Sequence, residues 1–108
     1  MMRDRYTTEK AKRAVLASDD GRYGVLLTHG TLELGYYVPQ GADPQQPHEQ
    51  DEIYIVQSGS GIFLLGDERL PFEAGEALFV PAGVTHRFED FTEDFAAWVV
   101  FYGPAGGE

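Results

Sequence analysis

Short apolar runs alternate with turn-forming residues from Tyr23 to Tyr102, and this alternation constrains the fold more than any other feature. The runs are rich in β-branched and aromatic residues and recur about every 8–12 residues, a spacing typical of antiparallel sandwiches and barrels. Prolines in residues 39–47 remove backbone donors and predict a loop there. The predicted strands are residues 23–29, 31–38, 52–57, 62–65, 69–72, 77–80, 86–88 and 95–102. We therefore expect an all-β antiparallel fold.

One segment with helical spacing precedes the strands, at residues 7–17. Thr7 can cap this helix, and Ala11 and Val15 share one of its faces. A chain of 108 residues is enough for a single domain. The expected parts of that domain are a helix and turn (residues 1–20), a β-barrel (residues 23–102) and a flexible tail (residues 103–108).

The chain carries a net charge of −10 and contains no cysteine. An acidic body repels nucleic-acid phosphates and anionic membrane surfaces, so we expect neither as a partner. Without cysteine, a bound metal must take nitrogen and oxygen ligands. No apolar run approaches the roughly 18 residues of a membrane span, and the N-terminus lacks the apolar core of a signal peptide. These features predict a cytoplasmic protein.

Two histidines and a glutamate are the candidate metal ligands. His48 precedes a predicted strand, Glu52 begins it, and His86 begins a later one. Because residues two apart share a face of a strand, Gln46 points the same way as His48 if that segment is extended. Burying such groups without partners costs several kcal/mol each, and a bound divalent ion removes that cost. The alternative is that they hydrogen-bond one another and water.

The spacing of these residues resembles the first sequence motif of the cupin superfamily. That motif places a Gly, a His-x-His pair, a Glu and a closing Gly in order. Gly41 precedes the loop, Gln46 stands at the first His position, and His48 stands at the second. Glu52 takes the Glu position, and six residues separate it from Gly59, as the motif requires.

A second stretch resembles the other cupin motif, which contains a Gly, Pro-x-Gly, a His and an Asn. The matching residues are Gly75, Pro81, Gly83 and His86, with Asp90 where Asn is usual. Fifteen residues separate Gly59 from Gly75, a spacing similar to that of compact microbial cupins. The resemblance implies an antiparallel double-stranded β-helix, or jelly-roll barrel, with a short N-terminal helix added. It also implies a homodimer.

Cupin metals are typically held by three His and one Glu. The resemblance therefore implies a divalent ion inside the barrel, held by His48, Glu52 and His86, with Gln46 as a weaker fourth ligand. Fe, Mn, Zn and Ni all accept such ligands. Glu52 is a candidate catalytic base if it is not tightly ligated. The aromatic residues that we expect to line a pocket are Tyr36, Tyr54, Phe63, Phe88 and Trp98.

Three functional hypotheses follow from the resemblance. The first is a metal-dependent enzyme, dioxygenase-like or isomerase-like, that acts on a small organic molecule. The second is a non-catalytic module that binds a metal or small ligand. A barrel retained for dimerisation alone is a third. His29 has no motif partner, so we expect it to be an exposed or hydrogen-bonded residue without a role in the site.

Overall fold

The computed structural model describes residues 5–43 and 47–108. Within these residues the chain forms one helix and eight strands, and all strand pairs are antiparallel. The elements are α1 (Thr8–Ala17), β1 (Tyr23–His29), β2 (Leu32–Tyr37), β3 (Asp51–Ser58), β4 (Ser60–Leu65), β5 (Glu68–Glu73), β6 (Ala77–Val80), β7 (His86–Glu89) and β8 (Ala96–Tyr102). The predicted all-β class with a short N-terminal helix is confirmed.

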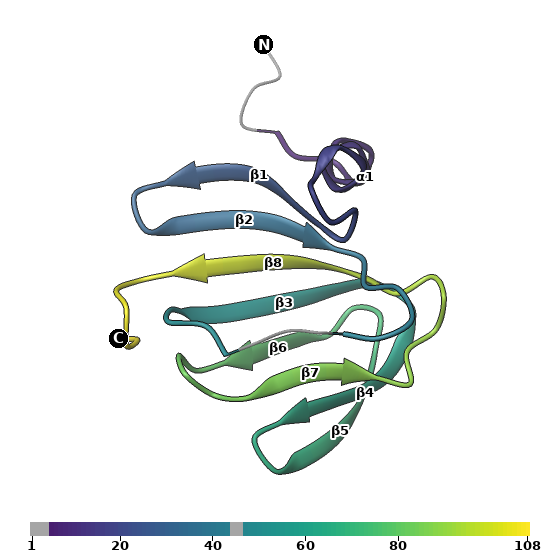
Figure 1. The fold of residues 1–108 in the computed structure, drawn as a ribbon, viewed down its shortest axis with the longest axis vertical. Coiled ribbons are helices and arrows are strands. Elements are labelled where there is room, and N and C mark those ends of the chain that lie inside the picture. The colour runs from purple at the N-terminus through teal and green to yellow at the C-terminus, as the bar shows by residue number, and fades with distance from the viewer. Residues whose placement is uncertain (1–4, 44–46) are drawn as a thin grey trace.

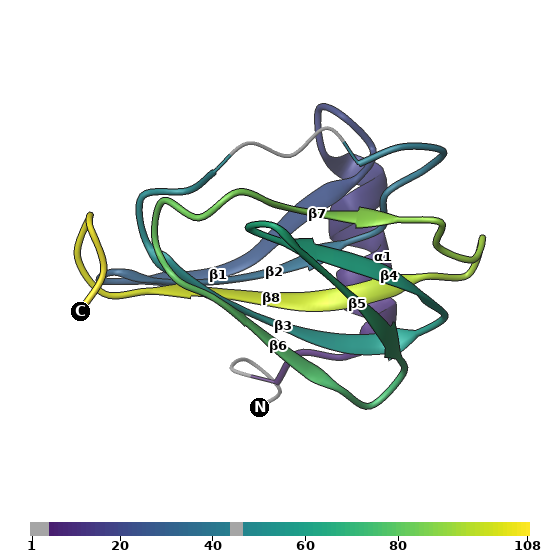
Figure 2. The ribbon, with the colours of Figure 1, turned by 90° about the horizontal axis from the view of Figure 1, so that it is seen from below.

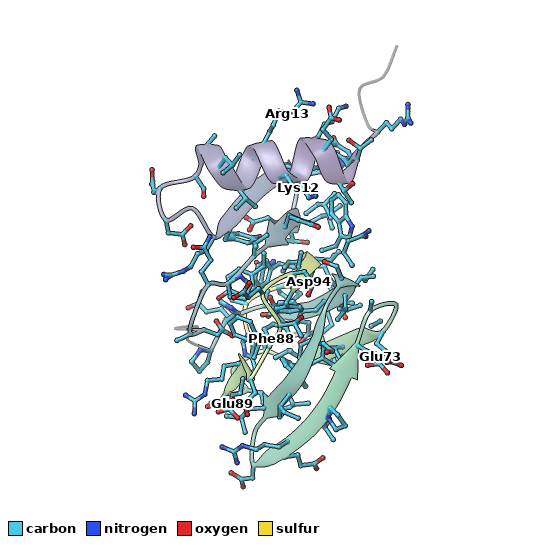
Figure 3. The ribbon with its side chains drawn as sticks, turned by 90° about the vertical axis from the view of Figure 1, so that its right-hand side faces the viewer. Lys12, Arg13, Glu73, Phe88, Glu89 and Asp94 are labelled. Atoms are coloured by element: carbon cyan, nitrogen blue, oxygen red, sulfur yellow. The ribbon has the colours of Figure 1, made fainter. Side chains whose placement is uncertain are left out.

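The strands form two sheets that face each other. The larger sheet has the order β1-β2-β8-β3-β6, and the smaller has the order β5-β4-β7. Figure 1 shows the strands of the larger sheet side by side, and Figure 2 shows the two sheets as separate layers. Buried aromatic residues fill the space between the layers, and Phe88 from β7 lies among them (Figure 3).

Alternation along β3 assigns one face of the larger sheet to the interior. Glu52, Tyr54 and Val56 are buried, whereas Ile55 is 45% exposed on the opposite face. Phe79 of the neighbouring strand β6 is 48% exposed. The interior face of β3 therefore combines apolar core residues with a single carboxylate.

The predicted homodimer stays a prediction.

Helix α1 covers the outer face of the larger sheet beside β1 and β2. Its N-cap is Thr7, whose hydroxyl oxygen accepts a hydrogen bond from the backbone N–H of Lys10 at 3.2 Å. Ala11 and Val15 pack against Tyr36 of β2, and Arg13 projects away from the sheet (Figure 3). The helix thus buries its apolar face on the side of the sheet opposite to the interior.

The ends of β3 and β8 are joined by the C-terminal residues. The backbone N–H of Gly106 donates to the carbonyl of Glu49 at 2.7 Å, and that of Glu108 donates to Asp51 at 3.1 Å. The flexibility predicted for residues 103–108 stays a prediction. In the part of the chain that the structure describes, no helix is long and apolar enough to cross a membrane.

Candidate metal centre

The structure brings His48, Glu52 and His86 together between the two sheets. His48 lies in the loop before β3, Glu52 is the second residue of β3, and His86 is the first residue of β7. One ligand atom from each residue lies within 4.8 Å of the other two. The cluster therefore joins a loop, the larger sheet and the smaller sheet at one point, and it could hold a metal ion.

The turn of the second motif holds the backbone of the first. Gly83 has φ +79°, a conformation that residues other than glycine rarely adopt, and its N–H donates to the carbonyl of His48 at 2.7 Å. The neighbouring N–H of Ala82 donates to Asp51 at 2.9 Å. The Pro-x-Gly turn thus fixes the position of the loop that delivers His48, which explains why both motifs are needed for one site.

Glu52 and His86 are each only 1% exposed, and three of their polar atoms lack hydrogen-bond partners. These atoms are both carboxylate oxygens of Glu52 and Nε2 of His86. Nε2 lies 3.3 Å from Oε1 of Glu52, but the arrangement does not meet the geometry of a hydrogen bond. Unpaired buried groups of this kind each cost about 1–3 kcal/mol of folding free energy.

The tautomer of His86 follows from the contact that its second ring nitrogen, Nδ1, makes with the backbone. Nδ1 lies 2.9 Å from the carbonyl oxygen of Val84, which can only accept, so Nδ1 carries a proton. In the neutral ring Nε2 then presents a lone pair toward a carboxylate oxygen of Glu52. Two acceptors at 3.3 Å repel each other unless a proton on Nε2 or a metal cation lies between them.

Electrostatics in the cluster favour a positive charge at this point. Burial opposes the charged form of His86, but the Glu52 carboxylate and the Val84 carbonyl outweigh it, so the pKa of His86 is raised. For His48 the effect of burial exceeds the attraction of Glu52, and its pKa is lowered. His48 is thereby kept in the neutral form that ligates metals.

Aromatic side chains fix the orientation of the histidines. The ring of His48 lies edge-to-face with Phe101, with centroids 5.0 Å apart, and 5.1 Å from the ring of His86. Nε2 of His48 is 3.9 Å from Oε1 of Glu52. His48 is half-buried, unlike the other two residues, because it lies at the edge of a cavity.

This cavity has a volume of about 430 Å³ and opens beside the cluster. Its lining residues are Asp20, Arg22, Tyr23, Glu33, Tyr37, His48, Glu52, Val99 and Phe101. The size falls in the range of small-molecule pockets, about 300–1,000 Å³. His86, which is fully buried, is absent from this lining and closes the far side of the cluster.

Tyr23 and Glu33 form a hydrogen-bonded pair in the cavity wall. The Tyr23 hydroxyl donates to Oε2 of Glu33 at 2.7 Å. Burial, and then the Glu33 carboxylate, raise the pKa of Tyr23, so its hydroxyl stays protonated. Gly35 makes room for this ring, since a Cβ added there would lie 2.3 Å from the Tyr23 hydroxyl oxygen.

The residues predicted to form the site fall into three groups. Tyr54, Phe63 and Phe88 lie in the core, and the first two approach the His86 ring with centroids 6.0 and 6.4 Å away. Tyr36 and Trp98 form a T-shaped pair and pack beneath α1, on the outer face of the larger sheet. The predicted ligand Gln46 lies outside the described residues.

The cavity wall contains residues that the sequence did not single out. Arg22, Tyr23, Glu33 and Tyr37 come from the first hairpin and the turn before it. The sequence predicts this hairpin but assigns its residues no role in the site. The signal that could have identified the cavity residues is the alternation of β2, which places Glu33, Gly35 and Tyr37 on one face.

Comparisons with known proteins agree with this architecture. Residues 34–102 match the family model described as the cupin domain. An uncharacterised protein from Streptomyces coelicolor is 38% identical over 90 residues, which cover 82% of this chain and 86% of the relative.

Two further matches differ in extent. An acireductone dioxygenase from Frankia alni is 45% identical over 58 residues, covering 49% of this chain and 28% of the relative, so the chain spans about a quarter of that enzyme. A cupin-2 domain protein from Shewanella frigidimarina has the same fold, with a TM-score of 0.72 at 18% identity over 95% of this chain and all of that one. The resemblance inferred from the two motifs is confirmed, and the chain belongs to the cupin family.

Proposed function

We propose that this protein binds a divalent metal ion at His48, Glu52 and His86 and is a metal-dependent enzyme acting on a small organic molecule. The observation that carries the proposal is that Nε2 of His86 and the Glu52 carboxylate oxygens face each other in the buried interior without hydrogen-bond partners. A cation between them would convert a costly arrangement into a favourable one.

The donor set fits such an ion. Two imidazole nitrogens and one carboxylate, on one side of a metal with open positions opposite, form the facial arrangement of non-haem iron enzymes. Manganese, zinc and nickel accept the same donors. When bound, the ion would act as a Lewis acid toward a carbonyl or enolate oxygen, and a redox-active ion would also support dioxygen chemistry. Gln46 as a fourth ligand stays a prediction.

The chain's own residues would prepare the site for a ligand. Val84 holds His86 in the tautomer that offers Nε2, and Phe101 fixes the ring of His48. The Tyr23 hydroxyl in the cavity wall donates its one hydrogen to Glu33, so its oxygen could accept a hydrogen bond from a ligand hydroxyl. The apolar side chains of Val99 and Phe101 exclude water from the same space.

The acireductone dioxygenase match supports a dioxygenase-like or isomerase-like activity, although the match covers 28% of that enzyme. Oxygen uptake with diketones and catechols would test the dioxygenase form on metal-loaded protein. Full metal occupancy without turnover of any such compound would support the second candidate, a non-catalytic binding module.

Metal analysis tests the first step of this proposal. Protein purified without a metal-affinity tag and reconstituted with Fe, Mn, Zn or Ni should bind about one equivalent of at least one of them. His86→Ala should weaken binding by more than the ~10–100-fold that changes beyond the ligands cause. Inductively coupled plasma mass spectrometry and metal titration measure both.

His29→Ala is the matched control, because His29 ends β1 and its side chain is exposed. It should keep the affinity of the wild type. A wild-type protein that binds none of the four metals, or a His86→Ala variant that binds as the control does, would contradict the proposed site.

A further inference from the structure

The cavity beside the metal centre contains one arginine, Arg22, whose side chain has no hydrogen bond or ion pair with any described residue. Its backbone, by contrast, is fixed on both sides. The N–H donates to Asp20 at 2.9 Å, and the carbonyl accepts from the N–H of Val38 at 2.8 Å. Arg13, Arg69 and Arg87, in contrast, form ion pairs with glutamates on the surface.

The carboxylates in the same cavity are already occupied. Asp20 accepts from the backbone N–H groups of Arg22 and Tyr23, and these bonds hold its pKa below the ordinary value. Glu33 accepts the Tyr23 hydroxyl at 2.7 Å. Glu52 belongs to the metal cluster. Outside the metal cluster, Arg22 is therefore the one charged lining residue whose side chain has no hydrogen-bond or ion-pair partner among the described residues.

We propose that the cavity binds a small carboxylate, with its anionic group on Arg22 and its other oxygen donors toward the cluster of His48, Glu52 and His86. A planar guanidinium matches a carboxylate through two parallel hydrogen bonds. The proposal rests on the proposed function for the second end of the ligand, which needs the metal, whereas the contact with Arg22 does not. To the proposed function it adds a class of ligand, small carboxylates, and the residue that selects this class, Arg22.

The charge of the whole chain makes a local cation necessary for such a ligand. With a net charge of −10, the protein repels anions at long range. Arg22 lies in a confined space with Val99 and Phe101, where an ion pair is screened less than at the surface. A cationic or polyhydroxyl ligand would instead need free carboxylates, and those of Asp20 and Glu33 already have partners.

A series of dicarboxylates tests this inference. Malonate, succinate and glutarate are titrated calorimetrically into metal-loaded protein, each against the monocarboxylate of the same carbon number (propionate, butyrate and valerate). One carboxylate can reach the metal in every compound, but only the dicarboxylates have a second group for Arg22. At least one dicarboxylate should bind about tenfold more tightly than its match, as expected for a charge-assisted hydrogen-bonded pair.

Arg22→Gln should abolish this preference while leaving metal content and monocarboxylate affinity unchanged, and Arg22→Lys should keep part of it. Arg13→Gln is the control, since it removes the same charge from the exposed face of α1. It should retain the wild-type preference. A preference that survives in Arg22→Gln, or one lost equally in Arg13→Gln, would overturn the assignment of Arg22.

Metal content measured on every sample separates the two proposals. If metal binds but no dicarboxylate exceeds its match, the carboxylate site is overturned and the metal site stands. If no metal binds, the proposed function fails, and titration of the metal-free protein decides the remaining question. If the metal-free protein binds a dicarboxylate and Arg22→Gln loses that binding, the carboxylate site is supported. If the metal-free protein binds no dicarboxylate, the carboxylate site is overturned. Tighter binding of putrescine or glycerol than of every dicarboxylate also overturns it.

Discussion

Asp43 is a buried carboxylate that is hydrogen-bonded to the strand carrying His86. It accepts hydrogen bonds from the Tyr37 hydroxyl and from the backbone N–H of Phe88, the latter at 2.7 Å. Phe88 follows His86 on β7, and Asp43 belongs to the same loop as His48. One side chain therefore ties Tyr37, at the end of β2, to the strand that supplies His86.

Asp43→Asn should disturb both stability and metal binding. The amide keeps one acceptor oxygen but replaces the other with a donor, so one of the two buried partners is left unsatisfied. The free energy of unfolding should fall by about 1–3 kcal/mol. Metal affinity should fall by ~10–100-fold, as for other residues that orient ligands. Urea unfolding and metal titration measure these effects.

Asp67→Asn, in the exposed turn between β4 and β5, is the control and should change neither quantity. If Asp43→Asn matched this control in metal affinity, Asp43 would support the core without positioning the ligands.

At the scale of single residues, the sequence predicted the cluster but not the cavity around it. His48, Glu52 and His86 were identified because motif spacing and strand alternation depend on local geometry. Tyr23 and Glu33 were not identified because their pairing depends on how β1 lies on β2 and on the space above Gly35. Such contacts follow from tertiary packing rather than from spacing.

Among the elements, the packing of α1 on the larger sheet depends on Gly24 of β1. A Cβ at this position would lie 2.5 Å from the backbone carbon of Ala14 and 2.5 Å from the backbone nitrogen of Val15. These are backbone atoms of the helix, so a larger residue must displace the helix itself. Glycine is needed here for close approach, and its φ is not in the left-handed region.

Gly24→Ala should lower the free energy of unfolding by about 1–3 kcal/mol, the usual cost of overpacking. Loosening of α1 should also appear as faster amide hydrogen exchange in residues 8–17. Metal affinity should not change, because α1 lies on the face of the sheet opposite to the cluster. Thr28→Ala, at an exposed position of the same strand, should leave the exchange of the helix unchanged. Protection in α1 equal to that of the wild type would contradict this view of Gly24.

The sequence predicted the positions of the helix and strands more completely than it predicted which strands pair. The predicted helix at residues 7–17 and each predicted strand correspond to an element of the structure, because turn residues and alternation mark them locally. The order β2-β8-β3 does not follow from the pattern, since β8 inserts between strands that are distant from it in the chain. Only the resemblance to a known barrel carried that information.

For the molecule as a whole, the two sheets protect one charged cluster while the surface carries most of the acidity. The interior holds Glu52 and His86 among aromatic rings. Most other carboxylates lie toward solvent, and Figure 3 shows Glu73 at the edge of the smaller sheet. The 18 acidic and 8 basic residues cannot all be paired, so the surface must repel itself.

This imbalance predicts that salt stabilises the protein. Raising the concentration of sodium chloride from about 20 to about 200 mM shortens the Debye length from roughly 20 to 7 Å and screens the repulsion between carboxylates. The same screening weakens the exposed ion pairs of Arg13 and Arg87, but each contributes only about 0–1 kcal/mol. With a net charge of −10, the loss of repulsion should dominate. We expect the free energy of unfolding to rise by about 1 kcal/mol, measured by urea unfolding of EDTA-treated protein.

Choline chloride at the same ionic strength should have the same effect, because screening does not depend on the identity of the cation. If the free energy of unfolding rises with sodium chloride but not with choline chloride, the cause is binding of sodium ions and not general screening. A fall in stability with both salts would mean that the surface ion pairs stabilise the fold more than the excess of carboxylates destabilises it. The acidity would then be a stabilising arrangement of paired charges, and the view of the surface as self-repelling would have to be abandoned.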